Sequence, residues 1–386
     1  MFLRPLLAIL VACLLVACGE AEGGTPEAAA YQQRIEEGSG VKLTGGPSAE
    51  EKALEAELFA NLNEFDGYVG VAVHDIDRRR TVDFNGKELF PQQSVSKLWV
   101  TLTALRMVDE GELDLLEPAQ IGFRDLTLFH QPVLQFVLAQ GMWRTTYADL
   151  MTRAITQSDN TANDMLLKRV GGPDAVRAMI DKAGLGAIRF GPGEREMQSE
   201  IAGVQWHQSY AVGQSFFKAR AQVPDLQRRI AFDAYVQDPV DGASPRAIAL
   251  ALGRVVRGEL LEKPTAEHLL ALLGQVKSGP NRLKGGVPEG WSIGHKTGTG
   301  QVLRYEQAGY NDVGILTAPD GRRYSIAVMI GRTALPIPQR MEMMHAIVRA
   351  VVSYHYAALG QPVPAGTFPE PEVPEESGGQ GPVEAG

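Results

Sequence analysis

The pattern that most constrains the fold of this chain is the separation of its strand-like segments into two groups, one near each end. Segments in which apolar and polar residues alternate lie at 68–76, 81–84, 291–295, 309–316 and 323–330. Helical spacing dominates the stretch between the groups, from about 91 to 285, and returns at 50–62 and 340–357. Strands from both ends can bury their apolar faces by joining one sheet. The sequence therefore predicts an α+β fold, an antiparallel β-sheet flanked by helices plus an inserted all-α domain.

The N-terminal residues predict export and attachment to a lipid. Residues 6–17 are almost entirely apolar, but the run is too short to span a bilayer, which is typical of a signal peptide. Leu15-Val16-Ala17-Cys18 resembles the lipobox of bacterial lipoproteins, which implies cleavage before Cys18 and acylation of its thiol. Gly19 stands where an Asp would indicate the inner membrane, so we expect the periplasmic side of the envelope, at the outer membrane. The alternative is an unlipidated secretory signal.

Composition divides the chain into four parts. They are the signal peptide at 1–17, a flexible tether at 18–47, a folded domain at 48–361 and a disordered tail at 362–386. The tether is rich in Gly, Glu and Ala, and the tail in Pro, Glu and Gly, so neither has much to bury. In the folded domain, 48–90 and 286–361 form the α/β part, and 91–285 form the helical part with an insertion at about 199–241.

Several classes of chemistry are excluded. The chain of 386 residues has two cysteines, Cys13 and Cys18, both in the N-terminal segment, so the folded domain has no thiol chemistry. Its seven histidines show no spacing typical of a zinc hydrolase, and we expect no metal and no other cofactor. The net charge of −9 argues against nucleic acid as a partner.

Ser94 and Lys97 are candidates for a nucleophile and its base. Ser94-Val95-Ser96-Lys97 opens a helical repeat just after Pro91, so the two side chains lie on one helix face, where the amine can activate the hydroxyl. The N–H groups of the helix N-terminus can stabilise an oxyanion. Ser215-Phe216-Phe217-Lys218 has the same spacing, but Pro224 soon interrupts the segment that follows it.

Two further polar runs stand beside predicted helices and strands. Ser158-Asp159-Asn160 lies between a helix at 147–156 and one that begins near 161, and taken alone it is typical of a helix cap. Lys296-Thr297-Gly298-Thr299-Gly300 follows the strand at 291–295 and suits the binding of a carboxylate close to the backbone. A second Lys-Ser-Gly run begins at Lys277, but it follows a helix and precedes Pro280, which is typical of a helix end.

The three runs in this order resemble the class A β-lactamases and the penicillin-binding proteins, over about residues 50–357. The resemblance implies that Ser94 attacks the carbonyl of a β-lactam, with the backbone N–H groups of Ser94 and Thr299 as the oxyanion hole. It implies that Lys97, Glu194 or both act as the base in acylation, and it leaves that alternative open. No cofactor is implied.

The same resemblance assigns the remaining polar residues. Ser158 passes the proton toward the lactam nitrogen, and Lys296 keeps that region positive. Asn160 holds the amide side chain of the substrate. Thr297 and Thr299 bind its carboxylate, and Gly298 lets the backbone approach.

Glu194 distinguishes a class A β-lactamase from a penicillin-binding protein, because a carboxylate that activates water lets the acyl-enzyme break down quickly. Class A enzymes carry it in a Glu-x-x-Leu-Asn pattern, and the similar stretch here is Glu194-Arg195-Glu196-Met197-Gln198. Met197 and Gln198 replace the usual Leu and Asn, and Pro192 replaces an Arg, so we expect a loop that is held differently. The alternative is that Glu194 and Glu196 are two solvated charges.

The insertion at 199–241 is longer than a compact class A enzyme requires. We expect its aromatic residues to form a small local core rather than a lid over the substrate. They are Trp206, Tyr210, Phe216, Phe217, Phe232 and Tyr235.

The function that the sequence favours is that of a monomeric serine β-lactamase whose partners are β-lactam antibiotics. One alternative is a penicillin-binding DD-peptidase or transpeptidase that acts on peptidoglycan. Another is a lipoprotein that binds β-lactams and turns them over slowly. The speed of deacylation distinguishes the three.

Overall fold

The structure is a computed structural model that describes residues 46–368. The predicted signal peptide, Cys18 and almost all of the predicted tether lie outside these residues, as does the tail beyond 368. Within the described range, no helix is both long enough and apolar enough to cross a membrane.

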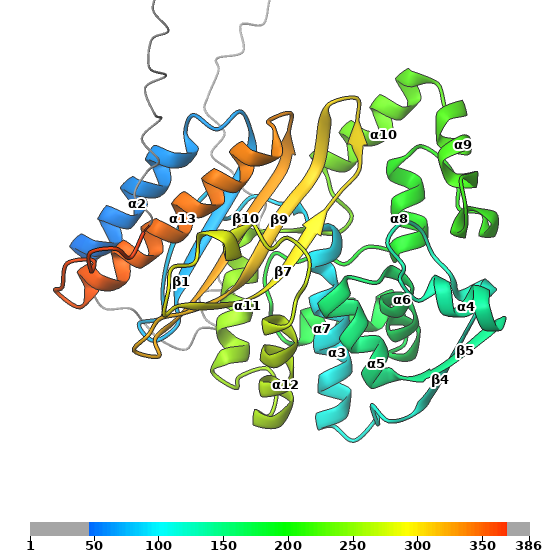
Figure 1. Cartoon of the computed structure of the whole chain (residues 1–386), viewed down its shortest axis with the longest axis horizontal. Helices are drawn as coiled ribbons and strands as arrows, with labels where there is room; N and C mark the ends of the chain where they lie inside the picture. The colour runs from blue at the N-terminus through cyan, green and yellow to red at the C-terminus, as the bar shows by residue number, and fades with distance from the viewer. Residues whose placement is uncertain (1–45, 369–386) are drawn as a thin grey trace, which may run out of the picture. The chain divides into compact units, whose positions relative to one another are not determined.

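The main sheet joins strands from both ends of the chain, as predicted (Figure 1). Its order is β2-β1-β10-β9-β7, with β8 paired to β9, and every pairing is antiparallel. The strands are β1 (Gly67–Asp75), β2 (Arg80–Phe84), β7 (Ser292–Thr299), β8 (Val302–Leu303), β9 (Glu306–Thr317) and β10 (Arg323–Thr333). One prediction needs correction: β7 does not end at 295 but runs through Thr299. The run that begins at Lys296 therefore lies on an edge strand.

Both faces of the sheet are covered, because its strands alternate between two cores. In β10, Ile326 and Val328 pack in one core with residues of α2 (Ala49–Leu62) and α13 (Ile337–Ala358). Ala327 and Met329, which point the other way, pack in a second core with α11 (Pro245–Val256). Figure 1 shows α2 and α13 side by side on one face and α11 on the other.

Local signals fix where these helices begin. Ser48 and Glu51 form a capping box at the start of α2, in which each side chain bonds to the backbone N–H of the other. Ser244 caps α11 through the N–H of Ala247, and Pro245 occupies the first helical position.

The middle of the chain is mainly helical, as predicted. Its other helices are α3 (Lys97–Asp109), α4 (Leu134–Gln140), α5 (Tyr147–Thr152), α6 (Asn160–Arg169), α7 (Pro173–Lys182), α8 (Glu194–Ile201), α9 (Ser215–Gln222), α10 (Asp225–Gln237) and α12 (Lys263–Gly274). Two small pairs of strands were not predicted from the sequence. They are β4 (Pro118–Gly122) with β5 (Met142–Thr146), and β3 (Phe90–Pro91) with β6 (Gly242–Ala243).

The segment at 199–241 folds as the end of α8, a short 3-10 turn, α9 and α10. Five of its six aromatic residues lie in or against local cores, as expected, but Phe217 is exposed. Phe216 packs with Leu128 and Ala202, and Phe232 and Tyr235 pack against Met197 and other residues of α8 and β8. The segment is therefore a folded extension of α8, stabilised by its own apolar contacts.

Candidate active site

The nucleophile candidate lies on a tight turn that leads into α3. Residues Gln93–Ser96 form a 3-10 turn, so Ser94 is in the first turn of the helical segment, as predicted. Gln93 has a positive φ of 53°, which is uncommon for a residue with a side chain. Lys97 is three residues beyond Ser94, and its Nζ lies 2.7 Å from the Ser94 Oγ.

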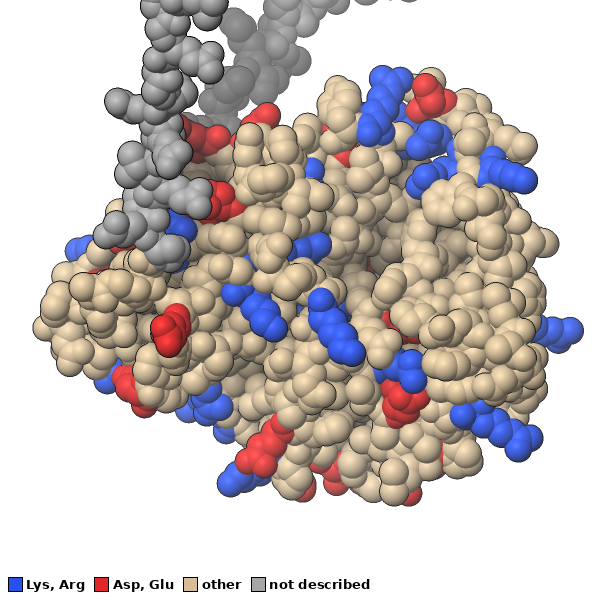
Figure 2. Space-filling model, in the orientation of Figure 1, with Lys and Arg blue, Asp and Glu red and all other residues tan. Residues whose placement is uncertain are grey.

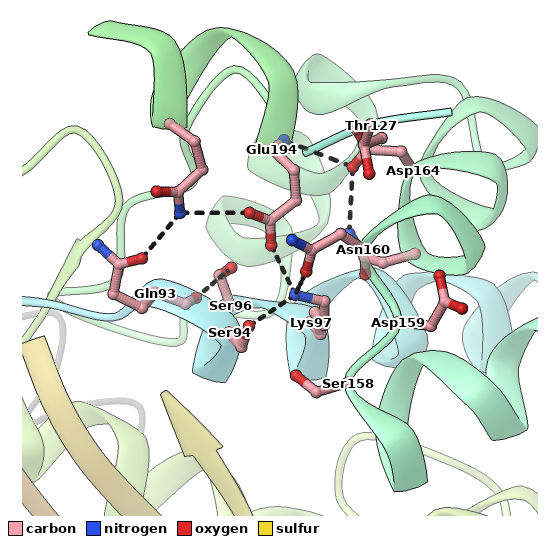
Figure 3. A network of polar contacts seen from close by, with 12 residues as sticks. Gln93, Ser94, Ser96, Lys97, Thr127, Ser158, Asp159, Asn160, Asp164 and Glu194 are labelled. Atoms are coloured by element: carbon pink, nitrogen blue, oxygen red, sulfur yellow. Dashed lines mark hydrogen bonds and ion pairs between the residues drawn. The ribbon is translucent and has the colours of Figure 1, made fainter. Parts of the chain in front are cut away.

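Lys97 joins three functional candidates from separate parts of the chain (Figure 3). Besides Ser94, its Nζ donates to the Oδ1 of Asn160 at 2.9 Å and to the Oε1 of Glu194 at 2.5 Å. Lys97 is 0% exposed and Glu194 is 4% exposed. A buried ammonium group needs such partners, because its desolvation is costly unless charge and hydrogen bonds compensate for it.

Ser158 is placed by an unusual backbone conformation. A π-helical turn at Arg153–Gln157 ends at Ser158, whose φ of 60° and ψ of 32° lie in the left-handed region. Asp159, and not Ser158, caps α6, because its side chain accepts from the Ala162 N–H. Thus one residue of the run serves as the helix cap, while the Ser158 hydroxyl is free to face the pocket.

Lys296 supplies the second buried amine. Its Nζ donates to the Ser158 Oγ at 3.0 Å and to the Thr297 carbonyl at 3.0 Å. It has no carboxylate partner among the ion pairs of the described residues, in contrast to Lys97. Burial, assisted by the charge of Lys97, holds the pKa of Lys296 well below its usual range.

Gly298 allows β7 to lie against the nucleophile turn. A Cβ at this position would be 2.3 Å from the Gln92 carbonyl oxygen, which fills the space that the glycine leaves. On the sheet side, the N–H of Gly300 donates to the Gly309 carbonyl. Hydrogen-bonded pairs alternate in antiparallel strands, so the N–H of Thr299, one residue earlier, points to the free edge of β7.

Glu194 begins α8, and Gln198 lies one turn after it. The Gln198 Nε2 donates to the Glu194 Oε2 at 3.3 Å and to the Gln93 Oε1 at 2.8 Å. Glu196, between them in sequence, is exposed. The interpretation of Glu194 and Glu196 as two solvated charges is therefore wrong for Glu194, because its carboxylate is buried against Lys97.

These residues surround one pocket of about 350 Å³. It is lined by Ser94, Phe129, His130, Gln157, Ser158, Asn160, Glu194, Gln198, Arg220, Ser278, Thr297, Thr299, Gly300 and Gln301. We call Thr297 and Thr299 the β7 wall, and Glu194 and Gln198 the α8 wall. Lys97 and Lys296 are buried and bonded to lining residues. Within the described residues, no group of His, Cys, Asp and Glu side chains suits a metal ion.

The two duplicate motifs, at Ser215–Lys218 and at Lys277, differ in whether they reach the pocket. Ser215 and Lys218 lie on α9 outside the pocket lining, and Lys218 is exposed. The run that begins at Lys277 follows α12, as expected, but it also reaches the pocket. Ser278 lines the pocket, and its Oγ lies 2.6 Å from the Thr297 Oγ1.

Comparison with known proteins agrees with the family that the sequence motifs resemble. The sequence profile of the family described as "Beta-lactamase enzyme family" matches residues 51–355. The chain belongs to this family. Two relatives are β-lactamase VEB-1 of Pseudomonas aeruginosa, 25% identical over 69% of this chain and 78% of its own, and β-lactamase FAR-1 of Nocardia farcinica, 27% identical over 91% and 95%.

A solved structure places this β-lactamase in class A. It is a variant of the last common ancestor of Gram-negative bacteria β-lactamase class A, 28% identical with a TM-score of 0.62, over 80% of this chain and 99% of that one. The chain is thus a class A serine β-lactamase by sequence and fold, which agrees with the predicted family and fold class.

The sequence did not identify Arg282 as a site residue in this β-lactamase. Its guanidinium donates to the Thr299 Oγ1 at 2.5 Å and to the Gly298 carbonyl at 3.0 Å. It also lies 3.7 Å from the centre of the Tyr310 ring. Arg282 lies in a stretch, Arg282-Leu283-Lys284, that supports the family resemblance, but it is outside the three catalytic runs, so only the fold shows that its charge reaches the β7 wall.

A buried chain of polar side chains supports the α8 wall, and no sequence motif indicates it. The Gln93 Nε2 donates to the Tyr235 hydroxyl at 2.6 Å, and that hydroxyl donates to the Asp241 Oδ1 at 3.0 Å. The N–H of Gln93 donates to the Asp241 Oδ2 at 2.7 Å. Burial raises the pKa of Asp241 to about 7, against the effect of these hydrogen bonds. Glu194 is thereby connected, through Gln198 and Gln93, to α10 and the end of the insertion.

Proposed function

We propose that the protein is a serine β-lactamase that hydrolyses the β-lactam amide through an acyl-enzyme on Ser94, and that water activated by Glu194 breaks this ester. The family and the class A fold support hydrolysis of β-lactams. The observation that carries the mechanism is the single amine of Lys97, 2.7 Å from the Ser94 Oγ and 2.5 Å from the Glu194 Oε1.

In acylation, the Ser94 Oγ attacks the lactam carbonyl carbon and gives up its proton. Lys97, Glu194 or both accept it, since the proton can pass from one to the other through their hydrogen bond. The N–H groups of Ser94 and Thr299 receive the oxyanion, and the orientation of the Thr299 N–H toward the free edge of β7 supports this role.

The C–N bond then breaks, and the nitrogen needs a proton. Ser158 supplies it, because its hydroxyl lies on the pocket and bonds to the buried amine of Lys296. Because burial lowers the pKa of Lys296, its ammonium form is a stronger acid than that of an exposed lysine. Ser158 can thus be reprotonated from within the site.

Other groups hold the substrate. Thr297 and Thr299 bind the ring carboxylate, with the charge of Arg282 behind Thr299. Asn160 uses one amide hydrogen for the Leu128 carbonyl. The other hydrogen is left for the carbonyl of the substrate's amide side chain.

In deacylation, Glu194 takes a proton from water as that water attacks the ester, and the Ser94 oxygen leaves with a proton from Lys97, which is bonded to it. The carboxylate is suited to this role because it is buried, fixed by Gln198 and Lys97, and on the pocket. A DD-peptidase has no need of such a group, so Glu194 favours the lactamase.

The soluble domain, begun after Cys18, tests the proposal with a chromogenic cephalosporin, by following both colour and protein mass. We expect sustained turnover by the wild type, no adduct with Ser94→Ala, and an accumulating adduct on Ser94 with Glu194→Gln, whose turnover falls by about 10²–10⁴-fold. Glu196→Gln, on the exposed face of the same helix turn, is the matched control and retains turnover.

Two results contradict the proposal. A single stoichiometric burst by the wild type, with a lasting adduct, indicates a penicillin-binding protein or a slow-turnover β-lactam-binding lipoprotein. No acylation at all removes Ser94 from the mechanism.

We also propose that the enzyme acts as a monomer, attached through a lipid on Cys18 to the periplasmic side of the outer membrane. The apolar run at 6–17 and the residues before Cys18 support the lipid anchor. In bacteria fed labelled palmitate, Cys18→Ser should lose the label, while Cys13→Ser keeps it. Density separation of the membranes tests the location, and light scattering of the soluble domain tests the oligomeric state. If Cys13→Ser carries no label either, the lipid anchor is contradicted.

A further inference from the structure

Arg220, on the inserted helix α9, brings a positive charge to the pocket. Its Nη1 donates to the Gln301 Oε1 at 3.2 Å, and its guanidinium lies 5.2 Å from the centre of the Phe217 ring and 5.7 Å from that of Phe216. These contacts hold the side chain over the pocket rather than out in solvent.

This guanidinium has no acidic partner. Among the ion pairs of residues 46–368, Arg220 forms none, whereas the nearby Arg229 pairs with Asp233 and Glu306. Arg228, which lines a small crevice together with Arg220, also has no ion pair in that range. Burial and the charge of Arg228 lower the pKa of Arg220, yet an arginine stays charged, so the site holds uncompensated positive charge.

The contacts of Arg220 place it near the α8 wall of the pocket. Gln301, which bonds to Arg220, donates to the backbone carbonyl of Gln198 at 2.7 Å, and Gln198 bonds to Glu194. Arg220 therefore lies where the turn after β7, which carries Gln301, meets the α8 wall. Figure 2 shows basic side chains gathered where Figure 1 draws α9 and α10, beside a hollow in the surface.

A β-lactam substrate can contact both the β7 wall and the α8 wall. With the lactam carbonyl at Ser94 and the ring carboxylate at the β7 wall, the acyl substituent on the carbon beside the carbonyl extends the opposite way, toward the α8 wall. We infer that Arg220, assisted by Arg228, forms a subsite for an anionic group on this substituent, so that the enzyme favours β-lactams with a second carboxylate or sulfonate. This inference rests on the proposed β-lactamase function.

The test uses two penicillins that differ by one carboxylate, benzylpenicillin and its α-carboxy derivative carbenicillin. The quantity to measure is the ratio of kcat/KM for carbenicillin to kcat/KM for benzylpenicillin. Arg220→Gln should lower this ratio about tenfold, mainly through KM, because a charge-assisted hydrogen bond to only one substrate is lost. Lys218→Gln, an exposed cation on the same helix, should leave the ratio unchanged.

Two further measurements separate binding from a structural role. Arg220→Met keeps the apolar stem that packs on the phenylalanines and should lower the ratio as much as Arg220→Gln, whereas Arg220→Lys should restore part of it. For the wild type, raising NaCl from about 0.05 to 0.5 M should lower the ratio, because salt screens the attraction. This last measurement needs no variant to fold.

The outcomes are distinct. Equal losses for both penicillins indicate that Arg220 only supports the fold, and a ratio that changes less than twofold in the variants and with salt overturns the subsite while β-lactam hydrolysis stands. If the wild type hydrolyses neither penicillin, the proposed function fails and the subsite fails with it.

Discussion

The two walls of the pocket differ in what holds them in place. The β7 wall is fixed by backbone hydrogen bonds along β9 and by the close approach of Gly298 to the nucleophile turn. The α8 wall is fixed by side chains that contact other side chains: Gln198 with Gln93, and Gln93 with Tyr235. A backbone ladder tolerates changes of its side chains, whereas a buried polar network depends on every member being satisfied. We therefore expect the β7 wall to fail only through steric change and the α8 wall through loss of single polar groups.

The largest effect is expected at the β7 wall from Gly298→Ala. The new Cβ, 2.3 Å from the Gln92 carbonyl oxygen, must push β7 away from the turn that carries Ser94. A misplacement of about 1 Å costs on the order of 100-fold in rate, so kcat/KM for a chromogenic cephalosporin should fall at least that much. Gly274→Ala is the control, because nothing lies within 4 Å of a Cβ there. Normal activity in Gly298→Ala would show that the wall can move freely.

Asp241 gives the α8 wall a dependence on pH. Its pKa in the folded protein is about 7, above the ordinary value of 3.8, so the folded state retains a proton that the unfolded chain releases. Its contribution to stability is therefore present at low pH and is lost as pH rises toward 7.

Unfolding by urea at pH 5 and pH 8 measures this contribution. Asp241→Asn cannot titrate there, so relative to the wild type it should gain roughly 2–3 kcal/mol of unfolding free energy between the two pH values. Asp238→Asn, an exposed change in the same segment, should follow the wild type. Parallel curves for Asp241→Asn and the wild type would place the pKa of Asp241 near its ordinary value.

A smaller effect is expected when the α8 wall loses its link to the nucleophile turn. Gln198→Ala removes the side-chain bonds to Gln93, Glu194 and Gln301, while the ion pair of Glu194 with Lys97 remains. The deacylation rate should fall about tenfold, the value of one hydrogen bond of about 1.4 kcal/mol, with a lesser effect on acylation. Single-turnover kinetics separates the two steps, and Glu200→Gln, exposed at the end of the same helix, is the control. An unchanged deacylation rate would mean that Lys97 alone orients Glu194.

The sequence was sufficient where function depends on neighbours along the chain. Ser94 and Lys97 meet because they lie three residues apart at a helix start, and the two groups of strands meet because their apolar faces need one sheet. Glu194 was found through a pattern in which Met197 and Gln198 depart from the family. Both residues are buried, Gln198 against Glu194 and Met197 in the core that α8 forms with α10.

The sequence was insufficient where function depends on residues that approach from distant segments. Arg282 lies outside the three catalytic runs, Ser278 is in a run typical of a helix end, and Arg220 stands in a segment longer than a compact class A enzyme requires. The left-handed conformations of Gln93 and Ser158 escape periodicity arguments too, because neither residue type requires them.

By itself, therefore, the sequence determined the class of fold, the family and the groups that carry the chemistry, because apolar periodicity and spacing within helices and strands are local properties. Only the tertiary structure decided how Glu194 is held, which cations reach the pocket and where uncompensated charge remains. Burial removes the water that would screen a charge, and which side chains share one buried volume depends on how the whole chain packs.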